Sequence, residues 1–173
     1  MKLGGITLYD VLDKLPYFES EPMKKSDFER IIIKTFRGLE SKHGFKMSEA
    51  VYSPKGCMAQ FQNTTTSVIL HYEIGEEPWL DIADVKDAEN KSTLGWLLVE
   101  RGIQKAPTPA AAFHSTPLAE KDLEASLEKK NQQLIEYGMD FINGDFSLMP
   151  ALQKRARKYA LECARYIAQH KSK

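Results

Sequence analysis

Three side chains that could do acid–base or metal chemistry, His71, Glu73 and Asp81, lie close together in the sequence. His71 and Glu73 are two residues apart in a segment that alternates apolar and polar residues, so both point to the same side of a strand. We expect Ile74 to pair with Leu80 across the next turn. That register places Glu73 opposite Asp81, where the two carboxylates repel each other. The cluster could hold a divalent cation or do acid–base work, but a solvated sheet face with a nearby lysine is the preferred interpretation.

The other histidines and the cysteines lack the companions that chemistry would need. Glu40 and His43 are three residues apart on a predicted helix, but a dimetal site needs a second such pair and further glutamates. Cys57 and Cys163 are too few and too far apart for a zinc ribbon or a disulfide framework. The sequence contains no phosphate-binding loop and no nucleophile elbow. We therefore expect no catalytic residue, no bound metal and no cofactor.

The composition is that of one folded α+β domain. The chain has 173 residues, of which 42% are hydrophobic and 28% charged, and this length suits a single domain over residues 1–173. Lys and Arg total 24 and so do Asp and Glu, so no net field selects nucleic acid or a membrane surface. The longest apolar runs, such as Trp96–Val99, are too short to span a bilayer, and no secretory signal is recognised. We expect a cytoplasmic protein.

Hydrophobic periodicity predicts the order of the elements. Helices are expected at Thr7–Leu15 and Ser26–His43, the second with a capping box at its start and Gly44 at its end. Apolar residues then alternate with polar ones in segments 45–51, 57–61, 68–74 and 79–85, which predicts a four-stranded antiparallel meander covered by helices. Further helices are expected over 93–101, over 117–142 and after Pro150. The last two should form a C-terminal antiparallel hairpin.

The turn between the first two strands has a specific prediction. Ser53–Gly56 reads Ser-Pro-Lys-Gly, which suits a three-residue hairpin loop with a left-handed glycine at its end. This loop pairs Ser53 with Cys57 and therefore Val51 with Ala59. We expect a positive φ at Gly56.

Charge is distributed unevenly along the chain. Residues 73–90 hold seven acids and one lysine, whereas residues 150–173 hold seven bases and one glutamate. A basic helix could bind nucleic acid, but the acidic segment would repel phosphate, so a bipolar surface suits a protein partner better. Ordinary solvated faces are the alternative. The predicted partner-binding residues are Glu76, Glu77, Asp81 and Asp84.

The segment Tyr137–Ser147, which reads Tyr-Gly-Met-Asp-Phe-Ile-Asn-Gly-Asp-Phe-Ser, follows a strand meander. Here the chain, from about Phe45 onward, resembles a group of small bacterial proteins in which a long helix ends at a Gly-Asp-Phe corner before a final helix. Several of these resemble immunity proteins that neutralise toxins, and they provide no catalytic residues to transfer. The corner also has a physical explanation, because Gly144 can end one helix and Asp145 or Ser147 can cap the next.

These observations predict a non-enzymatic protein-binding module. The resemblance implies an immunity-type protein that neutralises a basic toxin or effector. A secretion-type chaperone is the second possibility, although such chaperones are usually acidic and dimeric. The third is a metal-dependent enzyme that uses His71, Glu73 and Asp81.

Overall fold

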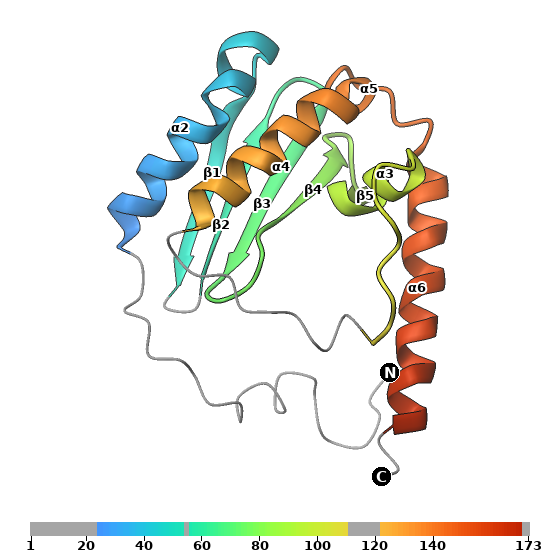
Figure 1. The fold of residues 1–173 in the computed structure, drawn as a ribbon. Coiled ribbons are helices and arrows are strands. Elements are labelled where there is room, and N and C mark those ends of the chain that lie inside the picture. The colour runs from blue at the N-terminus through green and yellow to red at the C-terminus, as the bar shows by residue number, and fades with distance from the viewer. Residues whose placement is uncertain (1–23, 54–55, 111–121, 171–173) are drawn as a thin grey trace.

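The computed structural model describes residues 24–53, 56–110 and 122–170. The helix predicted at Thr7–Leu15 and the start of the one predicted from residue 117 lie outside these ranges. A five-stranded antiparallel sheet in the order β1-β2-β3-β4-β5 has α2 and α4 on one face (Figure 1). The elements are α2 (Lys25–His43), β1 (Lys46–Ser53), β2 (Gly56–Gln62), β3 (Thr66–Glu73), β4 (Trp79–Asp84), β5 (Asp87–Thr93), α3 (Leu94–Glu100), α4 (Leu123–Tyr137), α5 (Met139–Ile142) and α6 (Met149–His170).

The α+β architecture and the meander are confirmed, but the sheet has five strands instead of the four predicted. The sequence of β5, Asp-Ala-Glu-Asn-Lys-Ser-Thr, shows no apolar alternation, so periodicity does not predict it. Its backbone pairs with β4, and Gln153 of α6 donates to the carbonyl oxygens of Glu89 (3.3 Å) and Lys91 (3.4 Å). Tertiary contacts therefore stabilise this polar strand. None of the helices within the described ranges is long and apolar enough to cross a membrane.

Helix α2 buries the face that its periodicity predicts, but it begins differently. It starts at Lys25, and no side chain caps its N-terminus, so the predicted capping box is wrong. Gly44 ends it in the left-handed conformation, at φ 68°, as predicted. The buried residues are Phe28, Ile31, Ile32, Thr35, Phe36 and Leu39.

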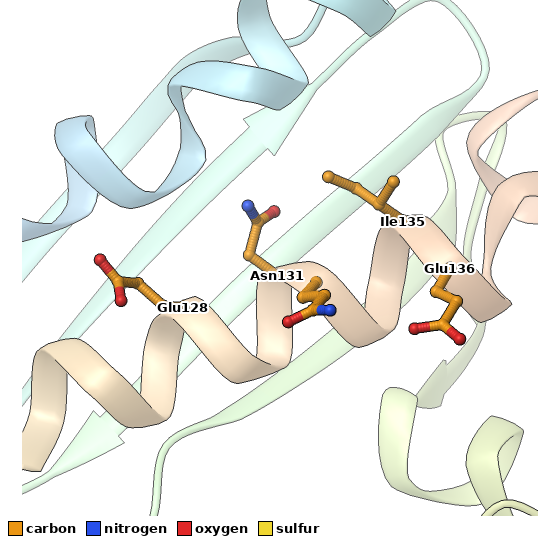
Figure 2. Close-up of a pocket in the computed structure, with 5 residues that line it drawn as sticks. Glu128, Asn131, Ile135 and Glu136 are labelled. Carbon is orange, nitrogen blue, oxygen red and sulfur yellow. The ribbon is translucent and has the colours of Figure 1, made fainter.

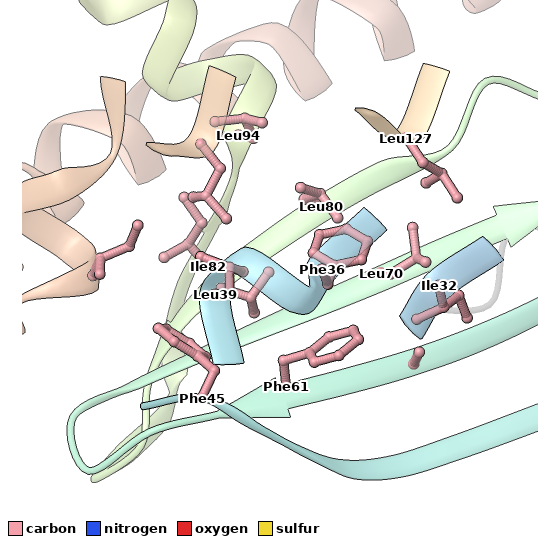
Figure 3. Close-up of a cluster of buried hydrophobic side chains, with 14 of the residues drawn as sticks. Ile32, Phe36, Leu39, Phe45, Phe61, Leu70, Leu80, Ile82, Leu94 and Leu127 are labelled. Atoms are coloured by element: carbon pink, nitrogen blue, oxygen red, sulfur yellow. The ribbon is translucent and has the colours of Figure 1, made fainter. Parts of the chain in front are cut away.

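The hydrophobic core lies between this helical layer and the sheet (Figure 3). Phe36 and Leu39 of α2 reach down to Phe61 and Leu70 of the sheet, and all four are fully buried. The rings of Phe36 and Phe61 stack with centroids 4.9 Å apart. Fully buried aromatic and leucine side chains of this kind each stabilise a fold by about 1.5–3 kcal/mol.

The register of the first hairpin differs by one residue from the prediction. Ser53 pairs with Gly56 and Val51 pairs with Met58, so two residues separate the paired positions instead of three. Gly56 does not have a positive φ, so that prediction is also wrong. A Cβ atom at position 56 would collide with the carbonyl oxygen of Tyr72. This glycine therefore serves the close approach of β2 to β3.

The helices after the sheet do not form the predicted hairpin. Helix α4 ends at Tyr137, because Gly138 interrupts it before the short helix α5. Helix α6 packs on β5 and α3 at the sheet edge, while α4 packs beside α2. Asp145 accepts a hydrogen bond from the Ser147 amide (2.9 Å) in the corner before α6. Because α6 begins at Met149, this bond orders the corner and does not cap the helix as predicted. This bond lowers the pKa of Asp145.

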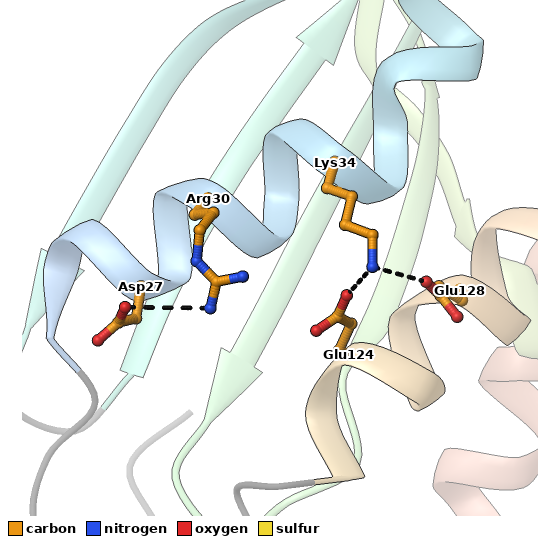
Figure 4. A network of polar contacts seen from close by, with 5 residues as sticks. All are labelled: Asp27, Arg30, Lys34, Glu124 and Glu128. Carbon is orange, nitrogen blue, oxygen red and sulfur yellow. Dashed lines mark hydrogen bonds and ion pairs between the residues drawn. The ribbon is translucent and has the colours of Figure 1, made fainter.

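Polar contacts join α2 and α4 on their shared side (Figure 4). Lys34 of α2 forms ion pairs with Glu124 and with Glu128, the latter at 3.7 Å. The amide nitrogen of Asn131 donates to the carbonyl oxygen of Thr35 at 2.9 Å. These contacts direct one flank of α2 toward α4. Toward β1, the Lys25 ammonium of α2 lies 5.0 Å from the centre of the Tyr52 ring.

Candidate functional site

The sheet presents a face that points away from α2 and α4, named here the outer face. On β3, the buried Val68, Leu70 and Tyr72 point to the helices, so Ile69 and His71 point to the outer face. Strand register places its side chains in cross-strand rows. One row contains Val51, Met58, His71 and Trp79, and the next contains Glu49, Gln60, Ile69, Asp81 and Thr93.

His71, Trp79 and Asp81 form a compact cluster on the outer face. The His71 and Trp79 rings stack with centroids 5.0 Å apart and 9° between their planes. His71 Nε2 lies 3.3 Å from Asp81 Oδ2, although the two are not aligned as a hydrogen bond. Both side chains are partly buried, and Trp79 is half-buried at the start of β4. The sequence pattern identifies His71 and Asp81 but misses Trp79, whose role depends on the register.

The predicted opposition of Glu73 and Asp81 is wrong. Leu80 pairs with Leu70 instead of Ile74, so Asp81 lies opposite Ile69, four residues before Glu73. Strand residues rise by about 3.3 Å each, which separates the two backbones by roughly 13 Å along the strand. No group of three His, Cys, Asp or Glu side chains within the described ranges is arranged to hold a metal ion. The three residues predicted as a possible cation site are therefore not brought together.

A second acidic group lies at the end of the outer face, where β3 turns into β4. Glu73 ends β3 as an exposed residue, and Glu76 follows in the turn. Partial burial raises the pKa of Glu76, and the negative charge of Glu73 raises it further. No lysine or arginine in the described part of the chain forms an ion pair with either. These two carboxylates are thus close together and uncompensated there.

The other predicted partner-binding acids have partners within the chain. Glu77 pairs with Lys130 of α4 (2.8 Å), the polar residue in the apolar series of that helix. Asp84 accepts a hydrogen bond from the Lys86 amide (2.8 Å) in the turn after β4. Asp84 therefore lies at the opposite end of β4 from Glu76 and Glu77. The structure separates the four acids instead of gathering them into one patch.

Replacing Glu76 with glutamine should raise the free energy of unfolding at pH 7 by at most about 0.5 kcal/mol, because solvent screens an exposed charge. A carboxyl group with a raised pKa destabilises the fold while it is ionised, and glutamine removes that cost. The gain should disappear as pH falls through the pKa of Glu76, where the native chain takes up a proton. Urea denaturation at several pH values measures this, and Glu77→Gln, which loses the Lys130 ion pair, should show no gain.

A shallow hollow of about 490 Å³ lies along α4 (Figure 2). Figure 2 shows Glu128, Asn131 and Ile135 on one side of the helix and Glu136 on the other. These four residues and Gln132 line the hollow, and the lining contains no histidine, cysteine or serine. Its two carboxylates, Glu128 and Glu136, lie on different sides of the helix in Figure 2.

The two cysteines are free, half-buried thiols. Burial raises the pKa of the Cys57 thiol, which keeps it protonated and unreactive at neutral pH. On α6, burial raises the pKa of Tyr159 to about 12, and Cys163 contributes to this increase. Cys57 therefore behaves as a packing residue.

The cluster around Trp79 combines an aromatic surface with carboxylates, which are groups that can bind a cationic side chain. Comparison with models of known families, with curated proteins and with solved structures gave no match to this chain.

Proposed function

We propose that this chain is a non-enzymatic protein-binding module that docks a basic protein partner, of the immunity type that neutralises a toxin or effector. The docking surface is the Trp79 patch, defined as His71, Glu73, Glu76, Trp79 and Asp81. The observation that carries this proposal is a pair of carboxylates, Glu73 and Glu76, without an ion-pair partner in the described part of the chain. They lie where β3 ends and the chain turns toward the half-buried Trp79 at the start of β4.

The chemistry of the patch suits an arginine or lysine side chain. A cation can lie over the face of a tryptophan ring while its charge interacts with nearby carboxylates. Stacking on His71 holds the Trp79 ring in one orientation, so little side-chain entropy remains to be lost on binding. Tryptophan and arginine are also the side chains that most often dominate the binding energy of protein interfaces.

The partner can be sought by affinity capture from native lysate, followed by binding measurements with the purified partner. Trp79→Ala should weaken the complex by about tenfold to a hundredfold, as expected for an aromatic anchor. Glu73→Gln with Glu76→Gln should lower the association rate and its dependence on salt. Glu128→Gln with Glu136→Gln, on α4, is the matched control and should bind like the native chain.

The proposal fails if the captured partner is acidic, or if it binds the Trp79 patch variants as tightly as the native chain. The immunity-type interpretation requires one further result. Expression of the partner alone should inhibit growth of the host, and co-expression of the native chain, but not of Trp79→Ala, should restore it.

A further inference from the structure

The two edges of the sheet differ in what covers them. At β5, Gln153 of α6 donates to two edge carbonyl oxygens, so a helix occupies that edge. At the other edge, β1 has β2 as its sole strand neighbour in the part of the chain that the structure describes. An edge strand with unpaired backbone groups is a template for pairing with another strand.

Exposed apolar side chains gather around this second edge. Val51, on the outer face of β1, is 47% exposed, and Met47 is 39% exposed on the same strand. Ile33, on α2, is 51% exposed. Within the described ranges, the large hydrophobic side chains that remain exposed are Ile33, Met47, Val51, Ile103 and Leu161. Three of these five thus belong to β1 or to the helix beside it.

Ile33 points to the β1 side of α2. Glu29 lies one turn earlier on the same flank of α2, close to Tyr52 of β1. Burial is the main cause that raises the pKa of the Tyr52 hydroxyl to about 12, and the negative charge of Glu29 raises it further. Lys34, the next residue after Ile33, points to the opposite flank and contacts α4 (Figure 4). Ile33, on the helical layer, and Val51, on the sheet, therefore border the same edge of the molecule.

We propose that two copies of this chain associate through this edge, with β1 pairing antiparallel to β1 of the second copy around a two-fold axis near Val51. The bulge between Met47 and Glu49 limits regular pairing to the second half of β1, which places the axis there. The two sheets then form one continuous ten-stranded sheet. The α2 helices meet beside the axis and cover Ile33.

Charge complementarity identifies a second copy as the occupant. Glu29 precedes Ile33 by one turn and Arg37 follows it by one turn, and neither side chain is buried. A two-fold axis beside Ile33 brings Glu29 of each copy opposite Arg37 of the other, so one surface supplies both halves of two symmetric ion pairs. The net charge of the chain is zero, so two copies do not repel each other at long range.

Sedimentation equilibrium over a roughly hundredfold range of concentration tests the association, because a dimer dissociates on dilution. The native chain should sediment as a dimer. Val51→Glu should raise the dissociation constant by about tenfold or more. Across the axis, the new carboxylate faces either the same substituted position of the second copy or Glu49 of that copy, and like charges repel. Ile33→Glu should act in the same way through α2.

Leu161→Glu is the matched control, since Leu161 is the most exposed of these hydrophobic residues, at 61%, and lies on α6. It should leave the dimer unchanged, and all three variants should melt within a few degrees of the native chain. A native chain that is monomeric at every concentration overturns the proposal. So does a dimer that survives both Val51→Glu and Ile33→Glu, or one that Leu161→Glu dissociates. The Trp79 patch lies on other strands, so failure here leaves the proposed partner binding intact.

Discussion

Replacing Asn63 with alanine is expected to lower the free energy of unfolding by about 2–4 kcal/mol, because several part-buried backbone groups lose their partners. Asn63 Oδ1 accepts hydrogen bonds from the amides of Thr65 (2.9 Å) and Thr66 (2.7 Å) in the turn between β2 and β3. Its Nδ2 donates to the carbonyl oxygens of His43 (3.4 Å) and Ile142 (3.2 Å). One side chain thus joins the turn to the ends of α2 and α5.

Two further substitutions separate these roles. Asn63→Asp keeps the acceptor for the turn amides but loses the donor, so it should lose an intermediate amount of stability. Thr64→Ala changes the exposed neighbouring residue of the same turn and should cost less than about 0.5 kcal/mol. Urea denaturation measures all three. A loss below about 1 kcal/mol for Asn63→Ala, as ordinary surface changes give, would show that water replaces these bonds at little cost.

Replacing Gly144 with alanine should destabilise the fold by about 2–3 kcal/mol, for two reasons that add. Gly144 has a φ of 86°, which side chains rarely adopt. A Cβ atom there would also lie 2.9 Å from Thr65 Cβ, inside the packing distance of two carbon atoms. The glycine allows the corner before α6 to pack against the same turn that Asn63 organises.

Two glycines serve as matched controls for this prediction. Gly102 has a φ of 71°, but a Cβ atom there would point into open space, so Gly102→Ala should cost about 1 kcal/mol, from the backbone alone. Gly38 lies inside α2 with open space around it, so Gly38→Ala should stabilise the protein by about 0.5–1 kcal/mol. Thermal melts should rank the variants in this order, and equal losses at Gly144 and Gly102 would contradict the role of Thr65.

Local signals predict the buried faces of α2 and α3, because each depends on residues within one or two turns. The periodicity of α2 identifies its whole buried face, and Gly44 ends the helix in the conformation that its sequence position implies. Likewise, Leu94, Leu97 and Leu98 are buried in α3 as their spacing predicts. The helix starts one residue later than predicted, with Thr93 accepting a hydrogen bond from the Trp96 amide (3.3 Å).

Strand register cannot be obtained from the same local signals. The pairing of Ile74 with Leu80 and the observed pairing of Leu70 with Leu80 both keep apolar residues on one face. Only packing of the whole sheet against α2 and α4 distinguishes them, and the candidate site depends on that difference. The observed register separates Glu73 from Asp81 and brings His71 opposite Trp79.

The α+β class, the meander and most of the residues that face the core could be predicted from the sequence, because alternation and helical periodicity are properties of neighbouring residues. Val51 is an exception, because the observed hairpin register places it on the outer face, where it is 47% exposed. The tertiary structure alone decided which side chains meet across strands, and that a polar segment becomes β5. Among the described residues, it also gives β1 a strand neighbour on one side alone, whereas α6 contacts the edge of β5. These outcomes depend on contacts between residues distant in the chain, whose free energies no local pattern contains.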